Sequence, residues 1–123
     1  MASAVGIQAN VNILYLENHA VFVEQVMREF LTGYQVTVVP SLAAARKALA
    51  QGNFHLILAD YDLDDGKGEE FVRECRIDHP ELPIIAVSSH DEGNAALIRA
   101  GASAVCSEME FERIRDVIAS LTA

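Results

Sequence analysis

Short apolar runs alternate along the chain with longer segments in which apolar residues recur at helical spacing. The runs are compact and rich in β-branched residues, which is typical of strands that are buried on both faces. They predict strands at residues 11–16, 35–39, 56–60, 84–88 and 104–106. A regular alternation of strand and helix indicates a parallel sheet with helices on both of its faces.

The segments between and after these strands predict five helices. We expect them at residues 20–31, 42–51, 69–78 and 91–100, and along the apolar stripe between 111 and 121. Ser41 is a good N-cap for the second helix. Either Ser89 or Asp91 is expected to cap the fourth helix, which should end at Gly101.

Length and composition limit the organisation of the chain. Its 123 residues, 51% of them hydrophobic, suit a single domain, which we place at 11–123. Residues 1–10 lack the basic start and apolar core of a secretion signal, so they predict a short flexible leader. The net charge of −9 disfavours binding to nucleic acid or to an anionic membrane. No apolar run approaches the roughly 18 residues of a membrane span.

The two cysteines, Cys75 and Cys106, lie in apolar or helical segments. We interpret them as buried free thiols, which persist in a reducing compartment. They therefore favour a cytoplasmic location.

The segment 54–68 is the first candidate for chemistry. Its apolar run 56–59 ends at Asp60, and a loop follows that contains further acids and the glycines Gly66 and Gly68. In open α/β sheets, ligands bind beyond the carboxyl ends of the strands. Asp60 is expected at such an end.

Three fragments, taken in order, resemble the receiver domain of two-component response regulators. They are ILYLENH, LILADYDLDDGKG, and PIIAVSS followed by RAGASAV, and the resemblance extends over residues 11–121. It implies a flavodoxin-like, doubly wound, five-stranded parallel sheet of order 2-1-3-4-5 with five helices. It also implies a signalling protein rather than an enzyme, which accepts a phosphoryl group from a histidine kinase or a phosphotransfer protein in a two-component or phosphorelay pathway.

The resemblance assigns a role to several residues. It makes Asp60 the phosphoacceptor and Ser88 a contact of the phosphoryl group. A divalent cation, Mg²⁺ or Mn²⁺, would be held by Asp60, by Glu17 through water, by Asn18 and by the main-chain carbonyl of Asp62. Receivers usually carry a second acid where this chain has Asn18. Because Mg²⁺ prefers anionic oxygens, we expect a weak cation site.

The end of the fifth strand departs from the receiver pattern. Glu108 and Met109 stand where receivers usually have Lys-Pro, and Val105 occupies the position of the aromatic switch. Two unit charges ~4 Å apart interact by about 4 kcal/mol at an effective dielectric constant near 20, so the reversed charge matters. Lys67 is the one lysine near the site that could reach in as a substitute. These departures keep open an alternative, a degenerate receiver that acts as a phosphorylation-independent protein–protein interaction module.

Two other site types fit the acidic loop less well. The pair Asp60 and Asp62 after an apolar strand resembles the first motif of haloacid-dehalogenase-type phosphatases, but it does not lie in the first strand and the further residues of that family are absent. The same acids imitate the start of an EF-hand loop, but Asp65 stands where glycine is needed and Phe71 where glutamate is needed.

Two further groups of residues carry alternatives. His19 and His90 are expected near the rim of the site, where we interpret them as solvated side chains rather than metal ligands. Arg99, Arg113 and Arg115 fall on the fourth and fifth helices. In receivers, the face formed by helix 4, strand 5 and helix 5 often pairs two domains, so a homodimer through this face is one possibility and a solvated charged surface is the other.

Overall fold

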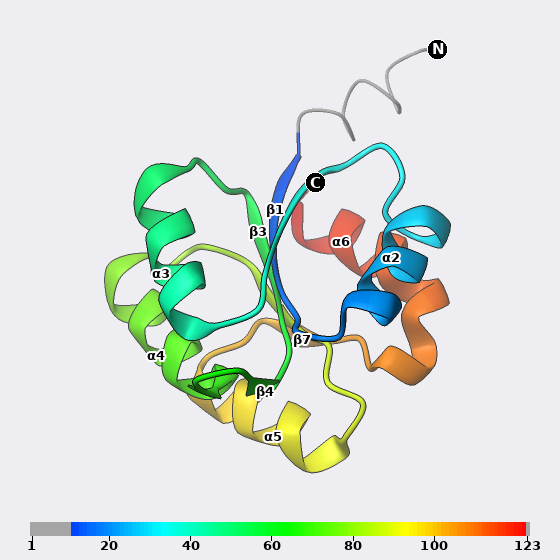
Figure 1. The fold of residues 1–123 in the computed structure, drawn as a ribbon. Helices are drawn as coiled ribbons and strands as arrows, with labels where there is room; N and C mark the ends of the chain where they lie inside the picture. The colour runs from blue at the N-terminus through cyan, green and yellow to red at the C-terminus, as the bar shows by residue number, and fades with distance from the viewer. Residues whose placement is uncertain (1–10, 123) are drawn as a thin grey trace.

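A computed structural model describes residues 11–122, so the expected leader at 1–10 lies outside the described residues. Figure 1 shows a central sheet with helices on both sides. The main strands are β1 (Asn12–Leu16), β2 (Gln35–Val39), β3 (Leu56–Ala59), β6 (Ile84–Ala86) and β7 (Ala104–Val105). The helices are α2 (Ala20–Glu29), α3 (Leu42–Gln51), α4 (Gly68–Asp78), α5 (Asp91–Ala100) and α6 (Ile114–Thr122), with a 3₁₀ helix η1 (Glu108–Arg113) before α6.

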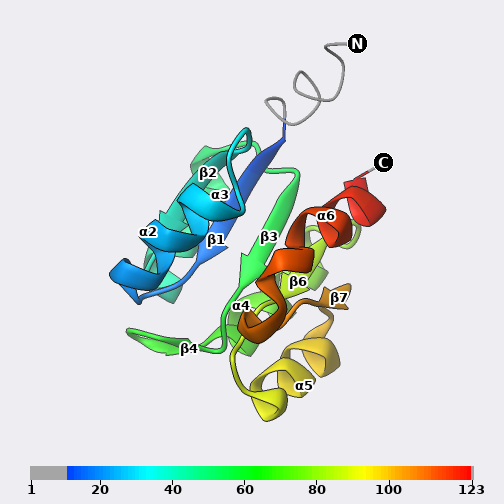
Figure 2. The same ribbon diagram turned by 90° about the vertical axis from the view of Figure 1, so that its right-hand side faces the viewer.

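The five strands form one parallel sheet in the order β2-β1-β3-β6-β7. The predicted flavodoxin-like order 2-1-3-4-5 is therefore confirmed. Helices α3, α4 and α5 cover one face, while α2 and α6 cover the other (Figures 1 and 2). Among the helices of residues 11–122, none combines the length and the apolar character that crossing a membrane requires.

Burial of the sheet on both faces explains the nearly continuous apolar runs of the strands. Side chains alternate along each strand, so Leu14 and Leu16 pack under α3 and α4, while Ile13 and Tyr15 face α2 and α6. All four are fully buried. Phe111 of η1 closes the second layer, where its ring centroid lies 6.3 Å from that of Tyr15.

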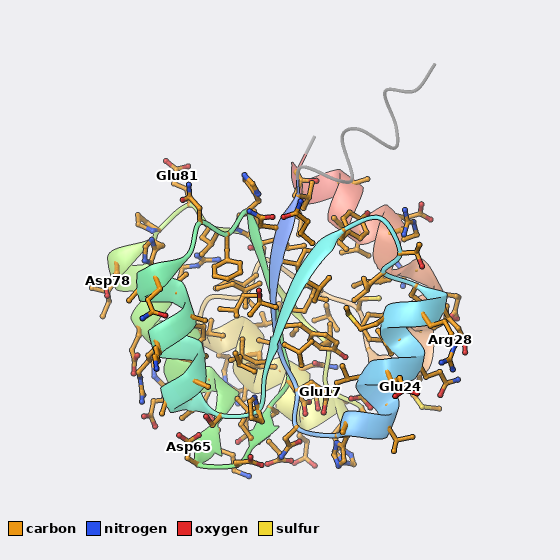
Figure 3. The ribbon with its side chains drawn as sticks, turned by 45° about the horizontal axis from the view of Figure 1, so that its top comes forward. Glu17, Glu24, Arg28, Asp65, Asp78 and Glu81 are labelled. Carbon is orange, nitrogen blue, oxygen red and sulfur yellow. The ribbon has the colours of Figure 1, made fainter. Side chains whose placement is uncertain are left out.

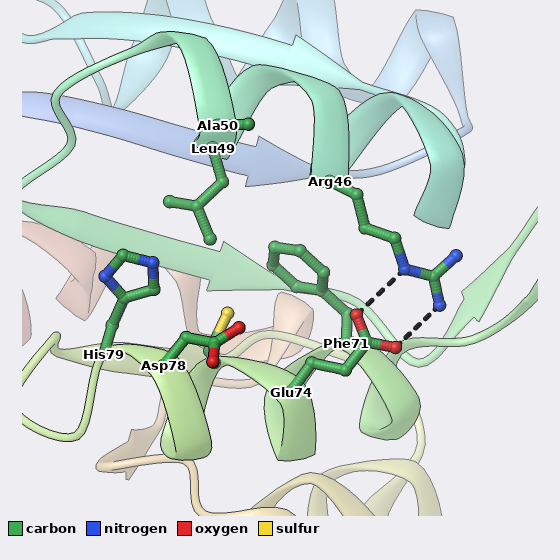
Figure 4. Close-up of a pocket in the computed structure, with 8 residues that line it drawn as sticks. Arg46, Leu49, Ala50, Phe71, Glu74, Asp78 and His79 are labelled. Carbon is green, nitrogen blue, oxygen red and sulfur yellow. Dashed lines mark hydrogen bonds and ion pairs between the residues drawn. The ribbon is translucent and has the colours of Figure 1, made fainter.

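The first helical layer contains a pocket between α3 and α4, lined by apolar residues such as Leu49 and Phe71 (Figure 4). At its rim, Arg46 of α3 pairs with Glu74 of α4 through bonds of 2.9 and 2.8 Å, and with Glu70 at 2.9 Å. None of the residues predicted for the site at the strand ends lines this pocket.

The acidic loop after β3 is more ordered than predicted. It contains a short antiparallel hairpin of β4 (Asp62–Leu63) and β5 (Gly66–Lys67). Asp65 lies between its strands, and its carboxylate accepts hydrogen bonds from the main-chain N–H groups of Leu42 (2.6 Å) and Ala43 (3.1 Å). These bonds satisfy free N–H groups at the start of α3 and hold the pKa of Asp65 below its ordinary value.

The predicted helix ends are right in part. Ser41 caps α3 as expected, since its Oγ accepts a hydrogen bond from Ala44 N at 3.0 Å. The expectation that Ser89 or Asp91 caps α5 is wrong, because His90 holds the cap position without a side-chain cap bond. The last helix begins with the 3₁₀ segment η1, in which Glu110 has non-helical backbone angles.

Candidate functional site

The predicted site residues gather where the central strands end. Glu17 follows β1, Asp60 follows β3 and Ser88 lies shortly after β6. The main chain continues the sheet's hydrogen bonding here, since Asp60 N donates to the oxygen of Leu16 at 3.1 Å and Glu17 N to that of Val39 at 3.0 Å. Figure 3 shows Glu17 where the chain leaves β1 for α2. The sheet therefore positions Glu17 and Asp60 through their backbone.

Glu17 and Asp60 are carboxylic acids buried beside one another. Their exposed fractions are 2% and 6%. Burial, the charge of Asp60 and the Glu108 carboxyl group raise the pKa of Glu17 to about 8. Burial also raises the pKa of Asp60 to about 6, although a hydrogen bond from the backbone of Tyr61 opposes the shift. Burial therefore favours the protonated form of both acids over the ionised form.

Unpartnered oxygens show that the pocket suits a cation. Oε1 of Glu17 and Oδ1 of Asn18 are buried and have no hydrogen-bond partner among the described residues. The amide nitrogen of Asn18 instead donates to Asp64 at 3.1 Å. A buried oxygen without a donor is costly, and a divalent cation satisfies such oxygens as ligands. The donor set therefore fits a bound metal ion.

His19 is the site residue whose role the sequence did not predict. Its Nδ1 lies 3.1 Å from Oε2 of Glu17, and its main-chain nitrogen lies 3.3 Å from the same oxygen. Donor atoms of Glu17, His19 and Asp60 all lie within 4.8 Å of one another. Its position two residues after the strand-end acid was the available signal. His90, by contrast, is exposed at the start of α5.

Ser88 is held by a buried residue that the sequence did not single out. Asn94 of α5 accepts a hydrogen bond from Ser88 N and donates one to Ser88 O, both at 2.9 Å. The Oγ of Ser88 accepts from His90 N at 3.1 Å. Gly93 leaves room beside them, because a Cβ at that position would lie 2.9 Å from the Ser88 Oγ. Ser88 is thus fixed at the strand end by the first turn of α5.

Gly68 explains why the loop after Asp60 ends in glycine. Its N–H donates to the oxygen of Tyr61 at 2.6 Å, which draws the start of α4 against the strand end. A Cβ on residue 68 would overlap the main-chain oxygen of Asp60. A glycine is therefore required for α4 to approach this closely.

Asp62 and Lys67 face each other across the hairpin. Their side chains form an ion pair and are more than half exposed, at 56% and 55%. The Lys67 ammonium also lies 5.1 Å from the centroid of the Tyr61 ring. The idea that Lys67 reaches in as a substitute cation therefore gains no support, since its contacts hold it at the hairpin surface.

Val105 ends the last strand, β7, and Glu108 begins the 3₁₀ helix η1 that follows it. Glu108 N donates to Ser88 O at 3.4 Å, which places the start of η1 next to the site. Its carboxyl group is close enough to raise the pKa of both Glu17 and Asp60. Val105 is 40% exposed and lines a groove between α5, β7 and η1 with Ile98 and Met109.

Comparisons with known proteins agree with this architecture. TrrA, a response regulator of Thermotoga maritima solved in complex with Mg²⁺-BeF, is 19% identical with a TM-score of 0.81, covering 90% of this chain and 98% of that one. The Francisella response regulator 1452 receiver domain is 16% identical with a TM-score of 0.80, covering 92% and 97%. The Mn²⁺-bound form of response regulator Rcp1 is 16% identical with a TM-score of 0.71, covering 91% and 94%. These likenesses show the fold.

The sequence itself carries a family match. No curated protein matches it significantly. The model of the response regulator receiver domain, however, matches residues 13–118, which include every element from β1 onward that forms the site. The chain therefore belongs to the response regulator receiver domain family, whose members are signalling modules of two-component pathways that interact with histidine kinases and are not enzymes.

Proposed function

We propose that this receiver accepts a phosphoryl group on Asp60 from the phosphohistidine of a histidine kinase or a phosphotransfer protein. The observation that carries the proposal is the burial of Asp60 at the end of the central strand, with donor atoms of Glu17 and His19 within 4.8 Å. Ser88 lies at the end of the neighbouring strand, where its hydroxyl would contact a phosphoryl oxygen. A nucleophile, a cation site and a hydroxyl are the parts that such a transfer needs.

The transfer itself is a displacement at phosphorus. A carboxylate oxygen of Asp60 attacks the phosphorus, the O–P bond forms as the P–N bond breaks, and the donor's imidazole leaves with the electron pair. Glu17, Asn18, Asp60 and the main-chain carbonyl of Asp62 would hold a divalent cation. A bound cation supplies positive charge for the phosphoryl oxygens. This charge matters because Glu108, rather than a cationic side chain, stands beside the pocket.

Intact-mass spectrometry after incubation with a small phosphodonor and Mg²⁺ or Mn²⁺ tests the proposal. We expect a single phosphoryl adduct on the wild type and none on Asp60→Asn. Asp91→Asn is the matched control, since Asp91 is an exposed carboxylate at the same end of the sheet, in the first turn of α5. Retention of the adduct in Asp60→Asn, or no adduct on the wild type with either metal or with a phosphorylated partner, would overturn it.

A second candidate is a pseudo-receiver that binds protein partners without phosphorylation. Glu108 beside the pocket and the exposed Val105 favour it. The groove around Val105, with Ile98 and the 80% exposed Met109, offers an apolar surface for a homodimer or another protein. This candidate predicts that Asp60→Asn leaves partner binding and self-association unchanged, whereas Met109→Asp weakens them. Size-exclusion chromatography with light scattering measures the self-association.

A further inference from the structure

We infer that His19 is a nitrogen ligand of the cation site, which therefore selects a first-row transition-metal ion over Mg²⁺. The inference rests on the cation site of the proposed function, but it concerns the unphosphorylated chain. It reverses the sequence-based interpretation of His19 as a solvated rim residue. Three kinds of observation carry it: the spacing of the donor atoms, the unpartnered buried oxygens, and the chemistry of the ligand set.

The spacing matches two ligands of one ion. The His19 Nδ1 and the Glu17 Oε2 lie 3.1 Å apart. Nitrogen and oxygen ligands about 2.1 Å from a metal, at angles between octahedral and tetrahedral, are roughly 3.0–3.4 Å apart. Without metal, a hydrogen bond joins these two atoms, so an ion can replace its proton with little movement. An oxygen of Asp60 lies within 4.8 Å of a ligand atom of each of these two residues, so a small movement of its side chain adds it as a third ligand. The ligand set would then be one nitrogen and two carboxylates.

The second observation is that the pocket is unsatisfied without an ion. Glu17 is 2% exposed, and its Oε1 has no hydrogen-bond partner among the described residues as long as Glu17 and the nearby Glu108 are both ionised. The buried Oδ1 of Asn18, the next residue along the chain, is likewise unpartnered. A metal ion can be coordinated by several oxygens at once. Its binding therefore satisfies two neighbouring buried oxygens that have no hydrogen-bond donor.

The chemistry of the donors decides which ion. Mg²⁺ is a hard cation that prefers oxygen ligands, and Asn18 offers it a neutral amide in place of a second carboxylate. Imidazole suits Zn²⁺, Co²⁺ and Ni²⁺. An amide at Asn18, in place of the usual carboxylate, therefore weakens Mg²⁺ binding. The imidazole of His19 adds a nitrogen ligand that favours transition-metal ions over Mg²⁺. His19 is 73% exposed at its side chain, so it can turn toward an ion without disturbing the core.

Isothermal titration of metal-free protein with Zn²⁺, Co²⁺ and Mg²⁺ separately tests the inference. We expect His19→Gln to weaken Zn²⁺ and Co²⁺ binding by about tenfold or more, and to change Mg²⁺ binding by less than about twofold. His90→Gln, at an exposed histidine at the same end of the sheet, is the control and should change neither. Nitrogen NMR of the His19 ring gives an independent readout, because direct ligation shifts that ring's resonances.

Two outcomes would overturn the inference. One is an equal loss of Zn²⁺ and Mg²⁺ affinity in His19→Gln, which would mean that His19 only shapes the pocket. The other is an effect on Zn²⁺ no larger than that of His90→Gln. Phosphorylation plays no part in these titrations. Selective binding without an Asp60 adduct would therefore refute the proposed function alone, and an adduct without selectivity would refute this inference alone.

Discussion

Asn94 and the main chain of Ser88 form a closed pair of hydrogen bonds, one in each direction and each 2.9 Å long. The pair is buried, since Asn94 is 4% exposed and Ser88 3%. It joins the first turn of α5 to the strand end that carries the site hydroxyl. These two buried hydrogen bonds thus connect α5 to the end of β6.

Removal of these two hydrogen bonds should destabilise the fold. Asn94→Ala leaves the buried N–H of Ser88 without a partner and leaves its C=O with only the long bond of 3.4 Å from Glu108 N, which costs roughly 1–3 kcal/mol of unfolding free energy. Urea unfolding followed by circular dichroism measures the loss. Glu92→Ala, an exposed residue in the same turn, should change the free energy by less than about 0.5 kcal/mol. A loss below about 1 kcal/mol in Asn94→Ala would contradict the assignment.

Gly68→Ala should disturb the site through the backbone. The new Cβ would overlap the main-chain oxygen of Asp60, so α4 has to move away from the strand end. We expect a loss of about 2 kcal/mol or more in unfolding free energy, within the range for strained core substitutions. The same variant should weaken metal binding, because Asp60 moves with its carbonyl. Wild-type stability together with wild-type metal affinity would show that the clash is relieved elsewhere.

The buried acids predict how stability depends on pH in metal-free protein. The folded-state pKa of Glu17, about 8, lies above its ordinary value of 4.5, so the fold favours the protonated acid. Its contribution to stability is fully present below about pH 4.5 and is lost as the pH rises through 8. Asp60, with a pKa of about 6, contributes in the same direction between about pH 4 and 6. The groups that face Glu17 are Asp60, Glu108 and His19.

Thermal unfolding in EDTA between pH 5 and 8 measures this dependence. We expect the melting temperature to fall across the range in the wild type, and to fall less in Glu17→Gln, which cannot ionise at that position. Addition of a binding metal at pH 8 should restore the lost stability, because the ion replaces the protons. Equal slopes for wild type and Glu17→Gln would contradict the raised pKa.

Reversal of the charge at residue 108 should reduce the electrostatic repulsion among the buried acids. Glu108→Lys removes an anion that raises the pKa of Glu17 and Asp60 and adds a cation beside them. The pKa of both acids should fall, the pH dependence of stability in EDTA should flatten, and more Asp60 adduct should form with a small phosphodonor. Glu112→Lys, an exposed change on η1, is the control for net charge. Identical behaviour of the two variants would assign the effect to net charge.

The ion pair between α3 and α4 should contribute little. Arg46 and Glu74 are each 42% exposed, and solvent screens charges at such positions. A double-mutant cycle with Arg46→Met and Glu74→Gln should give a coupling of about 0.5–1 kcal/mol that shrinks in 1 M salt. A coupling above about 2 kcal/mol would indicate that the pair is more than a surface contact.

The apolar runs predicted the strands well, because a sheet covered on both faces requires continuous apolar runs that stand out in the chain. The order of the strands was implied by the resemblance to receiver domains. The residues themselves indicated that Asp60 lies at a strand end, whereas Glu17 and Ser88 were assigned to the site by the resemblance. The sequence did not predict the hairpin after β3. In this hairpin the carboxylate of Asp65 points away from the other acids of the loop and accepts hydrogen bonds from the start of α3. The sequence did not single out Asn94, and it placed His19 at the rim of the site without its contact with Glu17, because such contacts depend on side-chain packing that periodicity does not encode.

The two buried cysteines lie on opposite sides of the sheet, so their reactivity can report on local opening of each side. Both thiols are free, and burial raises the pKa of Cys75 to about 12 and that of Cys106 to about 11, so neither reacts readily in the folded state. Cys75 lies in the layer under α4 and Cys106 in the layer under α6, with the sheet between them. The rate at which each thiol is labelled thus measures how often its own side of the sheet opens. One molecule thereby reports separately on the loosening of its two halves.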